Sequence, residues 1–267
     1  MKLTFWGTRG SVPCFSAEKV RFGTNTSCME MRLPGKQRIV FDAGTGVILL
    51  GDYLQRSGSL DHEVLHLFFS HFHWDHINGL PFFKPAYRKG TCMEIYGRSG
   101  VDSVFTAQLT APFSPIPLEA LTAQIHFNTL KAAVKIGSAT IQPYEQNHPQ
   151  GCFGYVVRAH GKKIVYATDT EPDNGPLDEV LLENAQGADL LIMDSNNSLD
   201  EARERRGWGH STWRDCVRTA KEAGVERLVL FHHDAHHNDE SISRKENIAQ
   251  REFPETVCAY DGLKITL

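Results

Sequence analysis

The heptapeptide SHFHWDH at residues 70–76 places three histidines and one aspartate within seven positions. It follows the apolar run LHLFF at residues 65–69, which is short and aromatic enough to predict a buried strand. Histidine and aspartate side chains bind divalent metals and transfer protons. The spacing therefore predicts a metal-binding cluster at the end of a strand.

The rest of the chain predicts an α/β protein. Its 267 residues, 41% of them hydrophobic and 22% charged, are enough to bury a full core. We see no Pro-, Gly- or Ser-rich linker, so we expect one domain over residues 1–267. One helix is predicted at 213–223, ending at Gly224. Strands are predicted at 3–6, 28–31, 38–41, 65–69, 94–96, 155–157, 163–166, 190–193 and 227–231, in two β-rich halves with helices outside.

Cysteine usage and charge limit the environment and the partners. The six cysteines form no CxxC pair, which argues against a zinc knuckle or a disulfide framework and favours a reduced, cytoplasmic location. No run of eighteen apolar residues is present, so we expect no membrane association. The formal net charge of -4 argues against a broad positive field for nucleic acid. A small anionic substrate needs only a local basic patch.

Metal-binding and acidic residues recur at the ends of the predicted strands. A single aspartate in such a place most often forms a turn. Several together, with a histidine in the loop EQNHPQG, indicate one pocket assembled from strand ends. These residues are Asp42, His71, His73, Asp75, His76, His148, Asp169, Asp194 and His232.

The spacing suits two metal ions. His71 and His73 can bind one ion from a tight turn, while Asp75 and His76 can bind a second. A carboxylate such as that of Asp169 can bind both ions at once. A hydroxide between them is a strong nucleophile at neutral pH, because metals lower the pKa of bound water.

The stretch HFHWDH at residues 71–76 matches the HxHxDH signature of the metallo-β-lactamase superfamily, and four further residues fall in the order of its remaining motifs. The resemblance covers nearly the whole chain and implies a four-layer αβ/βα sandwich with two divalent metal ions. Zinc is the leading candidate, and manganese and iron are compatible with the ligands. The resemblance implies that one ion is bound by His71, His73 and His148, the other by Asp75, His76 and His232, with Asp169 bridging and Asp42 supporting the ligands.

The stretch GWGHST at residues 207–212 resembles the ribonuclease Z and cyclic phosphodiesterase branch. GTRGSVP at 7–13 and YATDTE at 166–171 look like a bacterial subgroup of metallo-hydrolases in that branch. The resemblance implies that His210 contacts the scissile phosphate and protonates the leaving oxygen. Ser211 or Thr212 can also cap the following helix, whose free N–H groups could bind an anion.

The leading hypothesis is a dinuclear metal-dependent phosphodiesterase. A metal-bridging hydroxide would attack a small, possibly cyclic, phosphodiester, with Asp75, Asp169 and His210 as catalytic residues. The first alternative is a ribonuclease Z-like tRNA 3' endonuclease, disfavoured by the acidic charge and because we find no counterpart of the Gly- and Pro-rich tRNA-binding arm. The second is a non-catalytic metal-binding sensor. Branch members are often dimers, so a homodimer is one expectation.

Other polar residues have simpler interpretations. Arg203, Arg205 and Arg206 are expected to pair with nearby glutamates on a solvated helix rather than to bind phosphate. Among the last histidines, His232 directly ends its strand and is the expected ligand. No metal-binding role is assigned to His233, His236 and His237.

Overall fold

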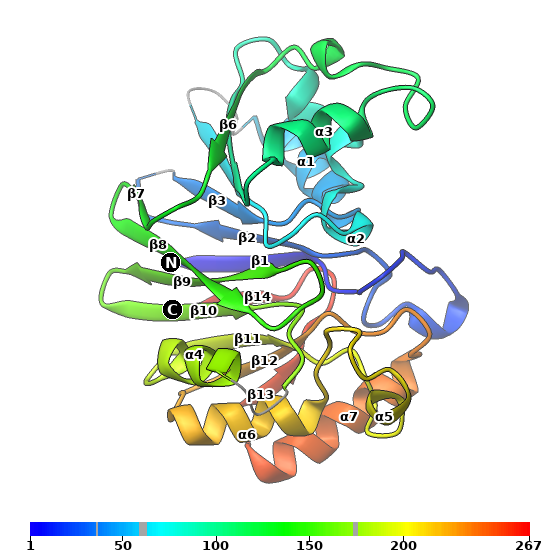
Figure 1. The fold of residues 1–267 in the computed structure, drawn as a ribbon, viewed down its shortest axis with the longest axis vertical. Coiled ribbons are helices and arrows are strands. Elements are labelled where there is room, and N and C mark those ends of the chain that lie inside the picture. The colour runs from blue at the N-terminus through cyan, green and yellow to red at the C-terminus, as the bar shows by residue number, and fades with distance from the viewer. Residues whose placement is uncertain (36, 59–62, 173–175) are drawn as a thin grey trace. The chain divides into compact units, whose positions relative to one another are not determined.

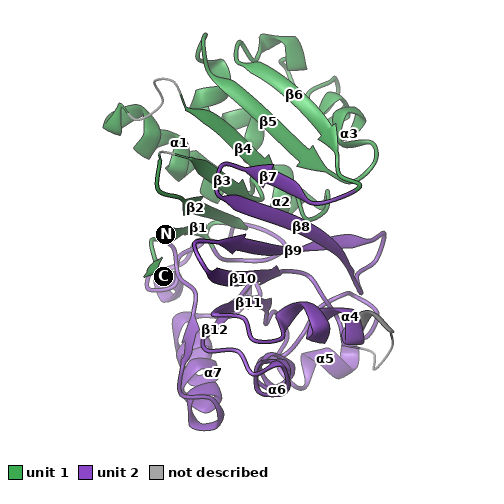
Figure 2. Ribbon diagram, turned by 90° about the vertical axis from the view of Figure 1, so that its left-hand side faces the viewer, with its two compact units in different colours: residues 1–7, 25–131, 262–267 green, residues 8–24, 132–261 purple. Residues whose placement is uncertain are grey.

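The computed structural model describes residues 1–35, 37–58, 63–172 and 176–267. They separate into two compact units (Figure 2). Unit 1 comprises residues 1–7, 25–131 and 262–267, and unit 2 comprises residues 8–24 and 132–261. Each unit contains one seven-stranded sheet. The expected single domain over residues 1–267 stays a prediction.

Unit 1 is built on a mixed sheet whose strands lie in the order β14-β1-β2-β3-β4-β5-β6. The strands from β3 to β6 are parallel, and the remaining pairs are antiparallel. Helix α1 packs its buried apolar residues into the core of this unit, at the spacing of an amphipathic helix. The elements are β1 Lys2–Gly7, β2 Cys28–Arg32, β3 Arg38–Phe41, α1 Gly46–Ser57, β4 Val64–Phe68, α2 Trp74–Ile77, β5 Cys92–Gly97, α3 Val101–Gln108, β6 Gln124–Thr129 and β14 Lys264–Thr266.

Unit 2 repeats this plan with the order β13-β12-β11-β10-β9-β8-β7. Its strands from β10 to β13 are parallel, and the others are antiparallel. Figure 1 shows α6 and α7 beside β12 and β13. The elements are β7 Val134–Ile136, β8 Ala139–Gln146, β9 Cys152–Ala159, β10 Lys162–Ala167, α4 Pro176–Ala185, β11 Leu190–Asp194, α5 Glu201–Glu204, α6 Trp213–Ala223, β12 Leu228–Phe231, α7 Asp239–Glu252 and β13 Thr256–Cys258.

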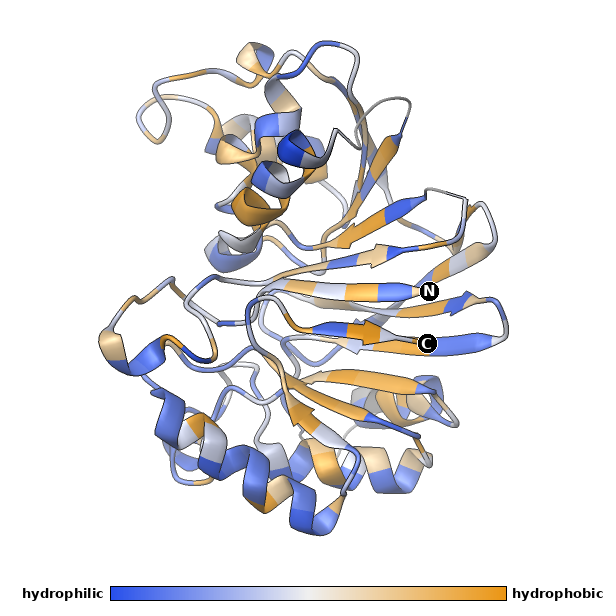
Figure 3. Cartoon of the chain, turned by 180° about the vertical axis from the view of Figure 1, so that it is seen from behind, coloured by the Kyte–Doolittle hydropathy of each residue, from blue (hydrophilic) through white to orange (hydrophobic). Residues whose placement is uncertain are grey.

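Helix α6 has the bounds that the sequence predicts. The Thr212 hydroxyl accepts a hydrogen bond from the Asp215 amide, and the Asp215 carboxylate accepts one from the Thr212 amide. Such an N-cap stabilises a helix by about 1 kcal/mol. Gly224 ends the helix with φ 61°, a conformation that glycine adopts without steric cost. Figure 3 shows hydrophobic and hydrophilic residues alternating around the helices and hydrophobic residues along the strands.

The sequence prediction of an α/β fold with two β-rich halves is confirmed, and every predicted strand corresponds to an observed one. The parallel strands explain how distant residues gather. Parallel strands end at the same edge of a sheet, so the residues that follow β10, β11 and β12 meet at one edge of unit 2. Of the described helices, none combines the length and apolar character needed to cross a membrane.

Candidate metal centre

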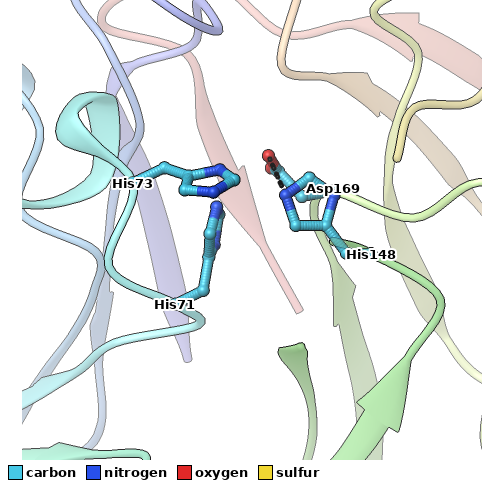
Figure 4. Close-up of side chains that lie close together, drawn as sticks. All are labelled: His71, His73, His148 and Asp169. Carbon is cyan, nitrogen blue, oxygen red and sulfur yellow. Dashed lines mark ion pairs between the residues drawn. The ribbon is translucent and has the colours of Figure 1, made fainter. Parts of the chain in front are cut away.

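In unit 1, the residues after β4 form a compact histidine cluster. The ring centroid of His71 lies 4.4 Å from that of His73 and 4.3 Å from that of His76. Helix α2 is a single turn that carries Asp75 and His76, whose carboxylate and Nε2 atoms are 3.4 Å apart. Figure 4 shows the side chains of His71 and His73 on this loop. All four ligands that the sequence predicts for unit 1 are therefore neighbours.

Asp42 supports this cluster from the end of β3. Its carboxylate accepts hydrogen bonds from His76 Nδ1 at 2.9 Å and from the Ser70 amide at 2.8 Å. The backbone of Asp42 has φ 59°, a left-handed conformation that is uncommon outside glycine and is concentrated at functional sites. The contact fixes the imidazole and leaves His76 Nε2 directed to the other candidate ligands.

In unit 2, Asp169 is the common neighbour of two predicted histidine ligands. One carboxylate oxygen lies 3.8 Å from His148 Nε2 (Figure 4), and the other lies 3.3 Å from His232 Nε2. All three side chains are buried. Asp169 and His232 both have positive φ, 47° and 57°, just after β10 and β12. A carboxylate with one oxygen toward each histidine has the arrangement needed to share two metal ions.

His210 lies beside the same group in unit 2. Its ring stacks with that of His232 at 5.3 Å between centroids. Its Nδ1 donates a hydrogen bond to buried Asp194 at 2.9 Å, which fixes the orientation of the ring. His210, His232 and Asp169 each offer a ligand atom within 4.8 Å of the others. The sequence identifies Asp194 as a strand-end carboxylate but does not reveal this contact.

Glu171 is a supporting residue that sequence reasoning missed. Its carboxylate accepts hydrogen bonds from the amides of Gly207 and Gly209 at 2.7–2.9 Å. The Gly209 carbonyl in turn accepts a hydrogen bond from His148 Nδ1 at 2.9 Å, which directs Nε2 toward Asp169. Glu171 thus joins the loop of Asp169 to the loop of His210. Its sequence signal is its place at the end of the stretch YATDTE, two residues after Asp169.

The N-terminus of helix α6 carries one of the two caps that the sequence predicts, that of Thr212. The amide of Ser211 donates to Asp194, the amide of Thr212 to Asp215, and the amide of Asp215 to Thr212 Oγ1. These amides have acceptors within the protein, and Asp215 adds negative charge to the first turn. The predicted cap by Thr212 is therefore confirmed, and the anion site expected at this helix stays a prediction.

The remaining histidines of the last motif have other partners. The imidazole of His233 is buried and contacts the Ala259 carbonyl and Lys245 Nζ, each at 3.0 Å. Burial, followed by the charges of Lys245 and Arg9, holds the pKa of His233 well below its usual value. His237 Nε2 contacts the Glu201 carboxylate at 3.0 Å.

Two of the arginines before His210, Arg203 and Arg205, form ion pairs, with partners that differ in part from those expected. The expected pairing of Arg206 stays a prediction. Arg205 lies 3.4 Å from Glu201, as predicted, but only 2.6 Å from Asp234, which the sequence did not indicate. The exposed Arg203 pairs with Asp200 at 3.5 Å. Arg205 therefore ties the segment before His210 to the loop that follows β12.

Comparisons with known proteins agree with this fold. The family model described as "Beta-lactamase superfamily domain" matches residues 37–233. Ribonuclease BN of Cronobacter sakazakii is 24% identical over 318 aligned positions that cover all of both chains.

Solved structures show the same fold. The metallo-β-lactamase fold protein YhfI from Bacillus subtilis has a TM-score of 0.73 and 22% identity, covering 99% of this chain and 98% of its own. A diphosphatase from the PhnP family has a TM-score of 0.70 and 19% identity, covering 100% of this chain and 97% of its own. The predicted metallo-β-lactamase fold is thereby confirmed. Because the family model spans most of the chain, this protein belongs to the β-lactamase superfamily and is a hydrolase of that superfamily.

Proposed function

We propose that the protein is a dinuclear metal-dependent phosphodiesterase that hydrolyses a small phosphodiester. The observation that carries the proposal is the His210–Asp194 pair beside His232 and Asp169. An imidazole held at Nδ1 by a carboxylate can present Nε2 to a phosphoryl oxygen or a leaving group. Such a histidine, next to metal ligands, suits phosphoryl chemistry.

The donor set fits two divalent ions. In His76 and His148, Nδ1 contacts a fixed protein oxygen, which is the usual way to orient an imidazole ligand. Nitrogen and carboxylate oxygen ligands suit zinc, and also manganese or iron. We assign one ion to His71, His73 and His148, the other to Asp75, His76 and His232, and Asp169 to both.

Bound divalent ions would lower the pKa of a water molecule and polarise phosphoryl oxygens. The protein's own residues would do the rest. Nε2 of His210 would hydrogen-bond a phosphoryl oxygen as negative charge develops, and in its protonated form would donate a proton to the leaving oxygen. Asp194 would keep the ring in the required orientation and stabilise its positive charge, and Asp75 would act as a ligand.

Chain length supports a small substrate. The alignment with ribonuclease BN runs over 318 positions, whereas this chain has 267 residues, so that relative has insertions that this chain lacks. The net charge of -4 also disfavours the long phosphate tracks that a polynucleotide requires. Both observations favour a compact phosphodiester over a folded RNA.

RNA processing is the second candidate, and the comparisons favour it more than the sequence did. Ribonuclease BN aligns with the whole chain. For a ribonuclease Z-like enzyme, the substrate would be a tRNA precursor. The proposed metal ligands and His210 would have the same roles in that reaction. The homodimer expected from the resemblance stays a prediction under either candidate.

One paired assay separates the candidates. Purified protein loaded with zinc or manganese is offered a 2',3'-cyclic nucleotide and a 3'-extended tRNA precursor, with His210→Ala as the control. The proposal expects hydrolysis of the cyclic phosphodiester and at most trace cleavage of the precursor. Specific cleavage at the tRNA 3' end, with no turnover of the cyclic compound, would reject the small-substrate proposal.

A further inference from the structure

A second group of metal-binding side chains lies on the sheet of unit 1, on strands β5 and β6. Cys92 and Glu94 are two residues apart on β5, so both side chains point to the same face of the sheet. His126 on β6 lies directly opposite Glu94 in the parallel register. The face is distinct from the helix-covered one, which buries the intervening residues Met93 and Ile95.

We propose that Cys92, Glu94 and His126 form a further binding site for a zinc-like divalent cation. Their ligand atoms all lie within 4.8 Å of one another. The side chain of His126 is 57% exposed and that of Glu94 is 24% exposed, so an ion can reach them from solvent. Thiolate, imidazole and carboxylate are each zinc ligands, and water could take the fourth position of a site with three protein ligands.

The group is already close to the required geometry. Tetrahedral ligands of zinc at about 2.1 Å from the ion lie about 3.4 Å from one another. The Glu94 carboxylate and His126 Nδ1 are 2.7 Å apart, so rotation of side chains is sufficient to admit an ion. Asn128 Nδ2 donates to the other Glu94 oxygen at 2.8 Å, the kind of contact that orients a metal-binding carboxylate.

The electrostatics support cation binding. Burial raises the pKa of Glu94, but hydrogen bonds from His126 and Asn128 outweigh burial, and the net shift is downward. The carboxylate is thus ionised at neutral pH. Burial and the Glu94 charge raise the pKa of the Cys92 thiol, so a metal would have to displace its proton. Binding should accordingly strengthen as the pH rises.

A comparison within the same protein shows why this group is the better candidate. Glu201, Asp234 and His237 in unit 2 also offer ligand atoms within 4.8 Å. There, the guanidinium of Arg205 already pairs with both carboxylates. A divalent cation would have to displace a positive charge from that group, whereas at Glu94 it would replace a hydrogen bond to an imidazole.

The proposed site would connect an edge strand to its neighbour. Among the strands that the structure describes, β6 is the last of its sheet and pairs with β5 alone. A metal bound between Glu94 and His126 would cross-link the two strands, and so reduce local opening of β6. This role is independent of catalysis.

Cobalt(II) provides a direct test, because sulfur-to-cobalt charge transfer in the near ultraviolet requires a thiolate ligand. Every ligand assigned to the proposed catalytic ions is nitrogen or oxygen, so that centre contributes no such band. Chelator-stripped full-length protein is titrated with cobalt, and metal content is measured after gel filtration. Cys92→Ser and His126→Ala are the test variants, and Cys14→Ser, at a partly exposed cysteine beside Lys19, is the matched control.

We expect the wild type and Cys14→Ser to show the band and to bind a third ion per chain. Cys92→Ser should lose both, and His126→Ala should bind this ion at least about tenfold more weakly. Hydrogen exchange in β6 should slow when zinc is added to the wild type but not to Cys92→Ser. Absence of the band in the wild type, or its persistence in Cys92→Ser, would overturn the proposal. His71→Ala should leave the band intact, because His71 is assigned to the catalytic ions. Loss of the catalytic metals can therefore be distinguished from loss of the site at Cys92.

Discussion

Unit 1 and unit 2 supply their candidate ligands in different ways. Unit 1 concentrates them in one stretch, residues 71–76, on a loop and a single helical turn after β4. Unit 2 distributes His148, Asp169 and His232 over separate loops, with His210 on a further one. A contiguous motif is arranged mainly by local backbone geometry, whereas distributed ligands depend on hydrogen bonds between loops. The supporting residues should therefore matter in different ways in the two units.

The contacts agree with that difference. In unit 1, one carboxylate, that of Asp42, holds both the Ser70 amide and the His76 ring. In unit 2, Glu171 binds the amides of the His210 loop, and Asp194 binds His210 itself. Two carboxylates in unit 2 therefore hold a loop and a histidine ring in place, whereas Asp42 alone does both in unit 1.

The largest expected effect belongs to Asp169, the proposed bridging ligand of unit 2. Asp169→Ala should lose at least one metal ion and nearly all hydrolysis, because two histidines lie against its two oxygens. Metal content by atomic emission, measured beside turnover, checks this. An active variant that retains two ions would disprove the bridging role.

His210→Ala should keep both ions and lose about 10² to 10⁴-fold in turnover, the usual contribution of a general acid. His210 lies close enough to Asp169 and His232 to be a metal ligand itself. The variant therefore distinguishes a histidine that acts on the substrate from one that binds a metal ion. Metal content is again the deciding readout. If an ion is lost together with His210, this histidine is a ligand and our assignment is wrong.

The loop that connects Glu171 to His148 can be tested with a matched pair of glycines. A Cβ at Gly209 would lie 2.0 Å from His148 Nδ1, whereas a Cβ at Gly207 would meet no atom of the described residues within 4 Å. Both glycines have φ 86°. Gly209→Ala should weaken metal binding by up to about a hundredfold through His148. Gly207→Ala bears the same backbone strain without the collision. If both variants lost the same metal affinity, backbone strain alone would explain the effect, and the contact with His148 would not.

A smaller effect, about tenfold, is expected from the supporting carboxylates. Asp42→Asn preserves shape and tolerates φ 59°, and should mainly lower metal affinity, because Asp42 holds the predicted ligand His76. Asp194→Asn should mainly lower turnover through His210. Metal titration and steady-state kinetics of both variants measure the contrast. If both variants lowered metal affinity and turnover to the same extent, the different roles assigned to Asp42 and Asp194 would be contradicted.

The smallest effect should come from Arg203, whose side chain is 82% exposed and pairs only loosely with Asp200. Arg203→Ala should change hydrolysis of a small phosphodiester by less than about twofold, as exposed ion pairs contribute little. A large loss confined to an RNA substrate would instead support the RNA-processing candidate.

The same contrast explains what the sequence could predict. The predicted ligands of unit 1 are recognisable because they lie within six residues, and His232 because it follows an apolar strand. Glu171 could not be identified, since its partners Gly207 and Gly209 are more than thirty residues away and are glycines whose backbone amides leave no trace in sequence. β6 was not predicted because half-exposed polar residues interrupt its apolar positions, as is common at a sheet edge.

Hydrolysis of bis(p-nitrophenyl) phosphate tests the central claim most directly. The protein is stripped with a chelator, its metal content is measured, and zinc, manganese or iron is then restored separately, with p-nitrophenyl phosphate as the monoester control. Our account predicts that diester hydrolysis is absent from the stripped protein, returns with two ions per chain, exceeds monoester hydrolysis and is lost in His210→Ala. A protein that binds two ions and hydrolyses neither this diester nor a cyclic nucleotide would contradict the account.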